Sequence, residues 1–207
     1  MRKPHNLITA YWDDMRHFQL EAERVERVRE LYDRCYTAAV SSLPDEDELK
    51  KAMPNLPTFD KRGIRYAILS SFLFLEAFIN QEYFDEMGFK NSPSELTPAQ
   101  KKNLDLIIFK TSFEDKWSLW VSDFSESRTG NKLNNLKGEK EFQELKKLKD
   151  WRNQLTHYKI HHLLLVAHEI ETIDNAREAI RIAVQTVKWY FNHTKKEMPD
   201  WMKHEII

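Results

Sequence analysis

Apolar positions recur every three or four residues along most of the chain, a spacing that predicts helices rather than strands. From about Leu7 to Leu43 the spacing is unbroken. It predicts one unusually long amphipathic helix that ends at Pro44. A helix of this length could break in two or could extend to a partner subunit. Five of its positions keep a seven-residue interval: Tyr11, Phe18, Val25, Tyr32 and Ala39.

A second apolar segment, from about Lys61 to Met87, predicts a helix that is apolar nearly all round, as expected at the centre of a bundle. Asp60 is a candidate cap for this helix and Gly88 a candidate stop. Residues 44–60 before it contain three prolines and an acidic cluster, which indicate a loop. The most apolar run is too short to span a bilayer and contains charged and hydroxyl side chains, so no membrane association is expected.

The next helix has a clear start signal. Thr97 and Gln100 have the spacing of a capping box, and Pro98 between them occupies the first helical position, so a helix is expected through about Phe109. A short helix rich in aromatic residues is expected from Phe113 to Phe124.

The rest of the chain alternates between loop and helix patterns. Residues 125–138 are expected to form a flexible loop, followed by a helix from about Glu139 to Tyr158. Residues 160–172 could be helical or extended. Asp174 is expected to cap a last amphipathic helix that runs to about His193.

Composition agrees with one globular all-α domain spanning residues 1–207, with a long N-terminal helix at about 7–43 and a bundle core at about 60–195. The chain has 207 residues, of which 41% are hydrophobic and 31% charged, and its 4 glycines and 7 prolines allow few tight turns. Its single cysteine, Cys35, excludes an internal disulfide framework. Asp13 and Asp14 interrupt any secretory signal pattern, so a cytoplasmic location is expected.

Charge is uneven along the chain. Residues 13–60 carry 7 positive and 12 negative side chains, whereas residues 128–162 carry 9 positive and 4 negative ones. The positive stretch could attract a polyanion such as nucleic acid. It could equally be the solvated face of a helix.

Within the helix at 139–158, Arg152 is placed unusually. At about 100° per residue, Arg152 falls inside the apolar arc, with Thr156 near it, while Asn153 and His157 lie together on the flank. A charge directed at a core is costly unless another charge meets it. Glu76, among apolar residues of the central helix, is the candidate partner, and Asn80 lies one turn later. The pair could be a structural ion pair or part of a functional site.

No other pattern indicates chemistry. The sequence has no phosphate-binding glycine loop, no cluster of cysteine ligands and no nucleophile elbow. His157, His161 and His162 lie close together, but no further ligand falls at a zinc spacing, so neither a metal nor a cofactor is expected.

The segment Trp151-Arg152-Asn153-Gln154-Leu155-Thr156-His157-Tyr158 resembles the signature motif of the HEPN superfamily: arginine, a polar residue that is usually asparagine, and histidine after a short gap. The run Ser71 to Asn80 is similar to the central helix of these proteins, and the order of the other expected helices agrees. The resemblance covers roughly residues 60–195 and implies a helical bundle of the HEPN type, to which the long N-terminal helix is an addition.

Many HEPN proteins are metal-independent endoribonucleases of toxin–antitoxin, phage-defence and RNA-processing systems. The resemblance therefore implies RNA cleavage by attack of the 2′-hydroxyl on the adjacent phosphate, in a homodimer, with an antitoxin or other regulatory protein as a further partner. Histidine suits proton transfer near neutral pH and arginine suits the phosphate charge. The expected catalytic residues are Arg152, Asn153 and His157, supported by Glu76, Asn80, Thr156 and Tyr158, with RNA contacts from Lys146, Lys149, Lys159 and His161.

Two alternatives remain open. The chain could be a non-catalytic HEPN-like scaffold or protein-interaction module that keeps the motif for dimer packing. It could also be a helical adaptor that uses the N-terminal helix as a coiled-coil arm, although few of its heptads carry clean apolar pairs. Oligomeric state measured together with RNA cleavage distinguishes the three.

Overall fold

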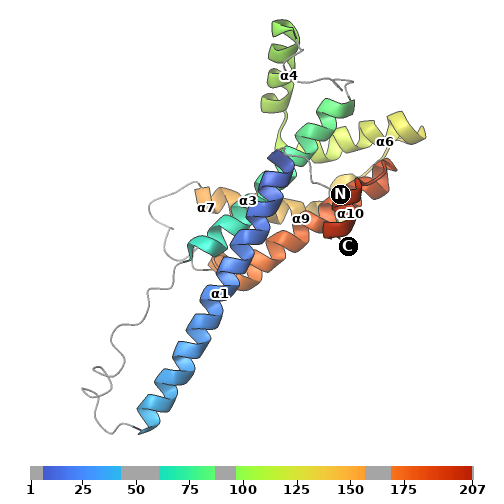
Figure 1. Cartoon of the computed structure of the whole chain (residues 1–207). Helices are drawn as coiled ribbons and strands as arrows, with labels where there is room; N and C mark the ends of the chain where they lie inside the picture. Colours follow the sequence, from blue (N-terminus) through green and yellow to red (C-terminus); the bar gives the residue numbers. More distant parts are fainter. Residues whose placement is uncertain (1–6, 43–60, 87–96, 157–168, 207) are drawn as a thin grey trace.

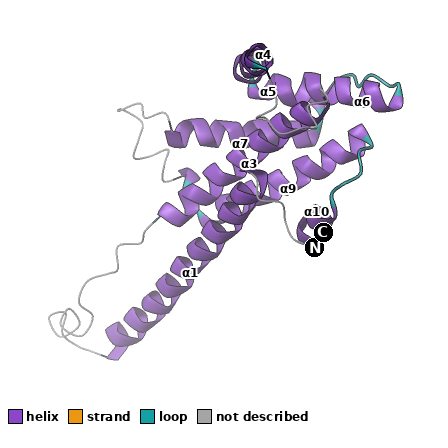
Figure 2. Cartoon of the chain, turned by 45° about the horizontal axis from the view of Figure 1, so that its top comes forward, coloured by secondary structure: helices purple, strands orange, loops and turns teal. Residues whose placement is uncertain are grey.

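A computed structural model describes residues 7–42, 61–86, 97–156 and 169–206, and these form an all-α bundle. Ten helical segments follow one another in the described part of the chain (Figures 1 and 2). They are α1 (Leu7–Ser42), α3 (Arg62–Glu86), α4 (Pro98–Lys110), α5 (Phe113–Asp115), η2 (Lys116–Trp120), α6 (Val121–Thr129), η3 (Leu136–Gly138), α7 (Lys140–Thr156), α9 (Ile173–Thr194) and α10 (Asp200–Ile206).

The central helix is α3, as the sequence predicts. It packs against α1, α7, α9 and η2, and Phe74, Leu75 and Ile79 are fully buried. By length and composition alone α3 could cross a membrane, but half of its most apolar window is buried inside the bundle, which accounts for its apolar character. The predicted cap Asp60 and stop Gly88 lie outside the described residues, as does the predicted loop at 44–60.

The N-terminal helix α1 is a single unbroken helix. Its first half is buried through Trp12, Met15 and Ala22, and Gly63 of α3 fits there because an added Cβ would lie 3.1 Å from the Ala22 nitrogen. Its last third extends beyond the bundle (Figure 1), and Leu31 there is 59% exposed. Of the two sequence alternatives, a broken helix is therefore wrong.

The aromatic segment forms one continuous helical run from Phe113 to Thr129 through α5, η2 and α6. The five residues of η2 adopt π-helical geometry. The expected end at Phe124 is therefore wrong, and residues 125–129 are helical rather than part of the loop. The helix ends at Gly130, whose φ of 73° lies in the left-handed region that glycine adopts without strain.

Two details at the C-terminal end differ from the sequence prediction. The N-cap of α9 is Thr172, whose hydroxyl accepts a hydrogen bond from the Asn175 N–H at 3.1 Å, whereas Asp174 lies inside the first turn. The short helix α10 follows α9 and was not predicted. The capping box at Thr97 and Gln100 is confirmed.

Candidate functional site

Arg152 lies on α7, half-buried at the contact with α3. Its guanidinium carbon is 5.1 Å from the centre of the Phe72 ring, a cation–π geometry. Its Nη1 donates a hydrogen bond to Oδ1 of Asn153 at 3.0 Å. The aromatic face and the neighbouring amide together orient the guanidinium.

The predicted ion pair between Arg152 and Glu76 is wrong. Glu76 instead lies with its Oε1 3.9 Å from Nζ of Lys116, a residue of the π-helical segment η2. The aromatic helix therefore brings its own cation to Glu76. No carboxylate among the described residues pairs with Arg152.

Lys116 is the buried cation of this region, and sequence analysis missed it. Its side chain is 3% exposed, and Nζ donates to Oδ1 of Asn80 at 2.9 Å and lies 5.6 Å from the Trp120 ring centre. Burial lowers the pKa of Lys116, and the nearby Glu76 acts in the opposite direction. The signal in the sequence was a lysine between Phe113 and Trp117, on a helix rich in aromatic residues.

The partners of these two cations share one face of α3. Phe72, Glu76 and Asn80 are spaced by four residues, so they follow one another along one side of the helix. Phe72 also packs against Phe113 with ring centres 4.5 Å apart. Glu76 and Asn80, expected to support the catalytic residues, therefore support Lys116 instead.

Basic residues lead along α7 toward the motif. Lys146, Lys149 and Arg152 are spaced by three residues and share one flank of the helix. Lys149 pairs with Glu114 at 2.5 Å, and its hydrogen bond holds the pKa of Glu114 below its ordinary value. Lys146 is exposed and pairs with no carboxylate of the described residues.

Most other cations of the positively charged stretch are compensated within the chain. Intrachain ion pairs join Lys132 to Glu126, Lys137 to Asp115, Lys140 to Glu144, Lys147 to Glu178 and Arg128 to Glu86. The positive charge of residues 128–156 is thus largely compensated by ion pairs within the chain. Among these described residues, Lys146 and Arg152 on α7 pair with no described carboxylate and are available to a polyanion.

The remaining expected site residues fall into two groups. Thr156 donates its hydroxyl to the backbone oxygen of Arg152 at 2.8 Å, so it serves its own helix. His157, Tyr158, Lys159 and His161 lie outside the described residues. Within the described part of the chain no group of histidine, cysteine, aspartate or glutamate side chains could hold a metal ion.

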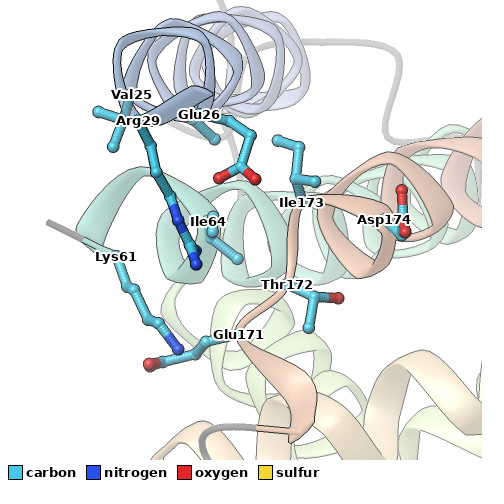
Figure 3. A pocket seen from close by; sticks show the side chains of 10 residues that line it. Val25, Glu26, Arg29, Lys61, Ile64, Glu171, Thr172, Ile173 and Asp174 are labelled. Atoms are coloured by element: carbon cyan, nitrogen blue, oxygen red, sulfur yellow. The ribbon is translucent and has the colours of Figure 1, made fainter. Parts of the chain in front are cut away.

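A pocket of about 290 Å³ lies where α1, the start of α3 and the start of α9 meet. Figure 3 shows Arg29, Lys61 and Glu171 pointing into it. Glu171 is buried and pairs with Arg65 at 2.5 Å. No residue of α7 lines this pocket, so it is separate from the Arg152 site.

No protein-family model, curated protein or solved structure matches this chain. The functional argument therefore depends on the residues and the geometry of the chain itself.

Proposed function

We propose that this chain is a metal-independent endoribonuclease of the HEPN type that cleaves RNA by 2′-hydroxyl attack on the adjacent phosphate. The observation that carries the proposal is Arg152. Its guanidinium is oriented by Phe72 and Asn153 and is paired with no carboxylate among the described residues. The bundle around it, with α3 at the centre and α7 and α9 following the aromatic helix, has the element order that the HEPN resemblance implies.

The lack of an ion pair between Arg152 and any described carboxylate favours a functional arginine over a structural one. An arginine kept to join two helices is expected to have its charge met by a carboxylate. Arg152 is instead held by an aromatic face and one amide oxygen, which leave further N–H groups of its fork for an anion. The planar fork matches the paired oxygens of a phosphate group.

In the proposed reaction His157 accepts the proton of the 2′-hydroxyl, and the resulting oxygen attacks the neighbouring phosphorus. The bond to the 5′-oxygen breaks, and that oxygen takes up a proton as it leaves. The products are a 2′,3′-cyclic phosphate and a 5′-hydroxyl. Arg152 stabilises the charge on the phosphate oxygens, and Asn153 holds Arg152 through its hydrogen bond.

The single motif histidine of each chain, His157, suits one of the two proton transfers. A second copy of the chain would supply the group for the other transfer, so we propose a homodimer with a composite site. Lys149 and Lys146, about one and two turns before Arg152, would contact flanking phosphates. Lys149 would give up its ion pair with Glu114 to bind the RNA.

The test is cleavage of single-stranded RNA by the purified chain in EDTA, with DNA of the same sequence as a control. We expect RNA cleavage to a cyclic phosphate and no DNA cleavage, because only RNA supplies the nucleophile. His157→Ala and Arg152→Ala should each lower the rate at least about 100-fold, whereas Lys140→Ala at the far end of α7 should not. Inhibition by EDTA, or full activity of His157→Ala, would contradict the mechanism.

Arg152→Ala should leave the fold nearly intact. Because Glu76 is paired with Lys116, removing Arg152 strands no carboxylate, and the loss is mainly a cation–π contact of about 1 kcal/mol. Urea denaturation of this variant therefore separates loss of chemistry from loss of structure.

A non-catalytic interaction module is the second candidate function, and α4 favours it. None of the residues of α4 is buried, although several are apolar. Exposed apolar helices are typical of proteins that bind other proteins. Lack of cleavage across a broad RNA panel, with the oligomeric state intact, would favour this function.

A further inference from the structure

Helix α4 is well formed but contributes little to the core of its own chain. It has a capping box, a proline at its first position and thirteen residues, yet none of them is buried. Figure 1 shows it standing at one end of the molecule. A helix of this length is marginal in water without packing, so α4 lacks the contacts that would normally stabilise it.

The apolar residues of α4 are concentrated near its end and lie on all of its sides. Five of the six residues from Leu104 to Phe109 are apolar, and Phe109 is 83% exposed. A helix that binds a membrane surface keeps one polar face in water. A helix that is apolar all round is normally enclosed by protein. The composition of α4 therefore favours a protein partner.

The same chain has a partly apolar groove formed by η2, α6 and the segment before α7. Its volume is about 470 Å³, and its apolar lining includes Leu119, Leu133 and Leu136. Leu119 is 56% exposed. No residue of α4 lines the groove, although only Thr111 and Ser112 separate α4 from α5.

The charges of the helix and the groove are complementary. Lys101 and Lys102 share a face of α4 with Leu106 and Phe109, and within the described residues neither lysine has an ion-pair partner. The groove contains Asp123, which also lacks an ion pair in the described part of the chain. The groove lysines do not compete for Asp123, because Lys132 and Lys137 are paired with Glu126 and Asp115.

We propose that α4 of one copy packs into this groove of a second copy, with Leu106 and Phe109 against its leucines and Lys101 and Lys102 beside Asp123. Each chain carries both the helix and the groove, and we take the exchange to be reciprocal, so that it closes as a symmetric dimer. This interface is distinct from the Arg152 site, and its test measures association rather than RNA cleavage.

Charge reversal on each half provides the experiment. One variant carries Lys101→Glu and Lys102→Glu, and the other carries Asp123→Lys. Each variant alone places like charges at both contacts, so its dimer dissociation constant should rise at least about tenfold. In a one-to-one mixture both contacts become complementary, so a heterodimer should form with affinity near that of the parent. Sedimentation equilibrium of the parent, of each variant and of the mixture measures this.

Two further variants test the apolar part of the proposed contact. Phe109→Glu should weaken the parent dimer at least about tenfold. Leu31→Glu, the same kind of change at an exposed apolar residue on the projecting end of α1, should leave it unchanged. Circular dichroism checks the fold of each variant, and substitutions at these exposed positions should leave the helix content unchanged. A parent that is monomeric at about 100 micromolar, variants that dimerise as tightly as the parent, or a mixture that gives no heterodimer would each overturn the proposal.

Discussion

At the scale of single residues, two cations from other helices contact one face of α3 in different electrostatic settings. Lys116 is almost completely buried and has Glu76 and Asn80 as partners. Arg152 is half-buried and contacts an aromatic ring and one amide. A buried lysine opposes folding unless its charge is compensated. The guanidinium of Arg152 pairs with no carboxylate of the described residues, and it keeps part of its hydration because it is only half-buried. Lys116 therefore contributes to the structure, and Arg152 is suited to bind an anion.

Lys116 gives a prediction for the pH dependence of stability. Burial lowers its pKa in the folded state below the ordinary value of 10.5, so near that pH the unfolded chain binds more protons than the folded one. The Lys116 contribution to the free energy of unfolding should therefore rise with pH as pH approaches 10.5 from below, and Lys116→Met should lose this increment. Burial raises the pKa of Tyr190, which contributes with the opposite sign in both parent and variant, so the difference between the two reports Lys116. Denaturant unfolding of parent and variant at a series of alkaline pH values measures it.

The control is the neighbouring exposed lysine Lys110, whose substitution to methionine should leave the pH dependence of the parent unchanged. If the parent and Lys116→Met show the same slope in alkaline buffer, then the Lys116 amine is not penalised by burial. That result would contradict the burial of the Lys116 side chain against α3.

At the scale of helices, local signals in the sequence were enough for most boundaries. The helix expected at about 7–43 is α1, which the structure describes from Leu7 to Ser42. It could be predicted because its seven-residue apolar spacing lies within one helix and needs no knowledge of the other helices. The capping box at Thr97 is likewise a property of four consecutive residues. The run from Ser125 to Thr129 was missed because its polar composition is typical of a loop, and tertiary packing of Ser125 overrides that preference.

Pairing between helices could not be predicted in the same way. The expected Arg152–Glu76 pair relied on two helical projections made separately, with no knowledge of how α3 and α7 are rotated relative to each other. A π-helical turn, which no simple periodicity announces, then placed Lys116 at Glu76. The place of Arg152 on α7, partly buried toward the core, was predicted from the sequence, but its aromatic partner Phe72 was not.

The start of α9 gives a prediction at this scale. Thr172 caps the helix through the Asn175 N–H, so Thr172→Ala should lower the free energy of unfolding by about 1 kcal/mol. Asp174→Ala is the matched control, because Asp174 is exposed and its ion pair with Arg177 is long, at 3.7 Å. Its effect should stay below about 0.5 kcal/mol in urea denaturation. Equal losses for the two variants would show that Asp174 is the effective cap.

At the scale of the whole molecule, the buried core and the exposed apolar surface lie in different places. The core is built around α3, between α1 and α9, and α7 presents the Arg152 site at its surface. Exposed large apolar side chains among the described residues include Leu106, Ile107 and Phe109 of α4, Val28 and Leu31 toward the projecting end of α1, and Leu119 of η2. In the proposed dimer, a second copy would cover the exposed apolar residues of α4.

The proposed dimer and the proposed nuclease together predict how activity depends on assembly. If two copies complete one site, the charge-reversed variants should each cleave RNA slowly, because each is largely monomeric at assay concentrations. Mixing them should restore the rate of the parent over the same concentration range in which the heterodimer forms in sedimentation. The measurement is the cleavage rate of a labelled RNA against total protein concentration.

The same mixture identifies which copy supplies the catalytic groups. When His157→Ala is introduced into only one of the two charge-reversed variants, every heterodimer keeps His157 in one of its two chains and lacks it in the other. A composite site that needs both histidines should then lose at least about 100-fold in rate, as when both are removed. A site complete within one chain should lose about half of its rate, since one of the two sites remains whole. Cleavage by the isolated variants at the full parental rate would separate the two proposals, because the nuclease would stand while its dependence on the α4 interface would not.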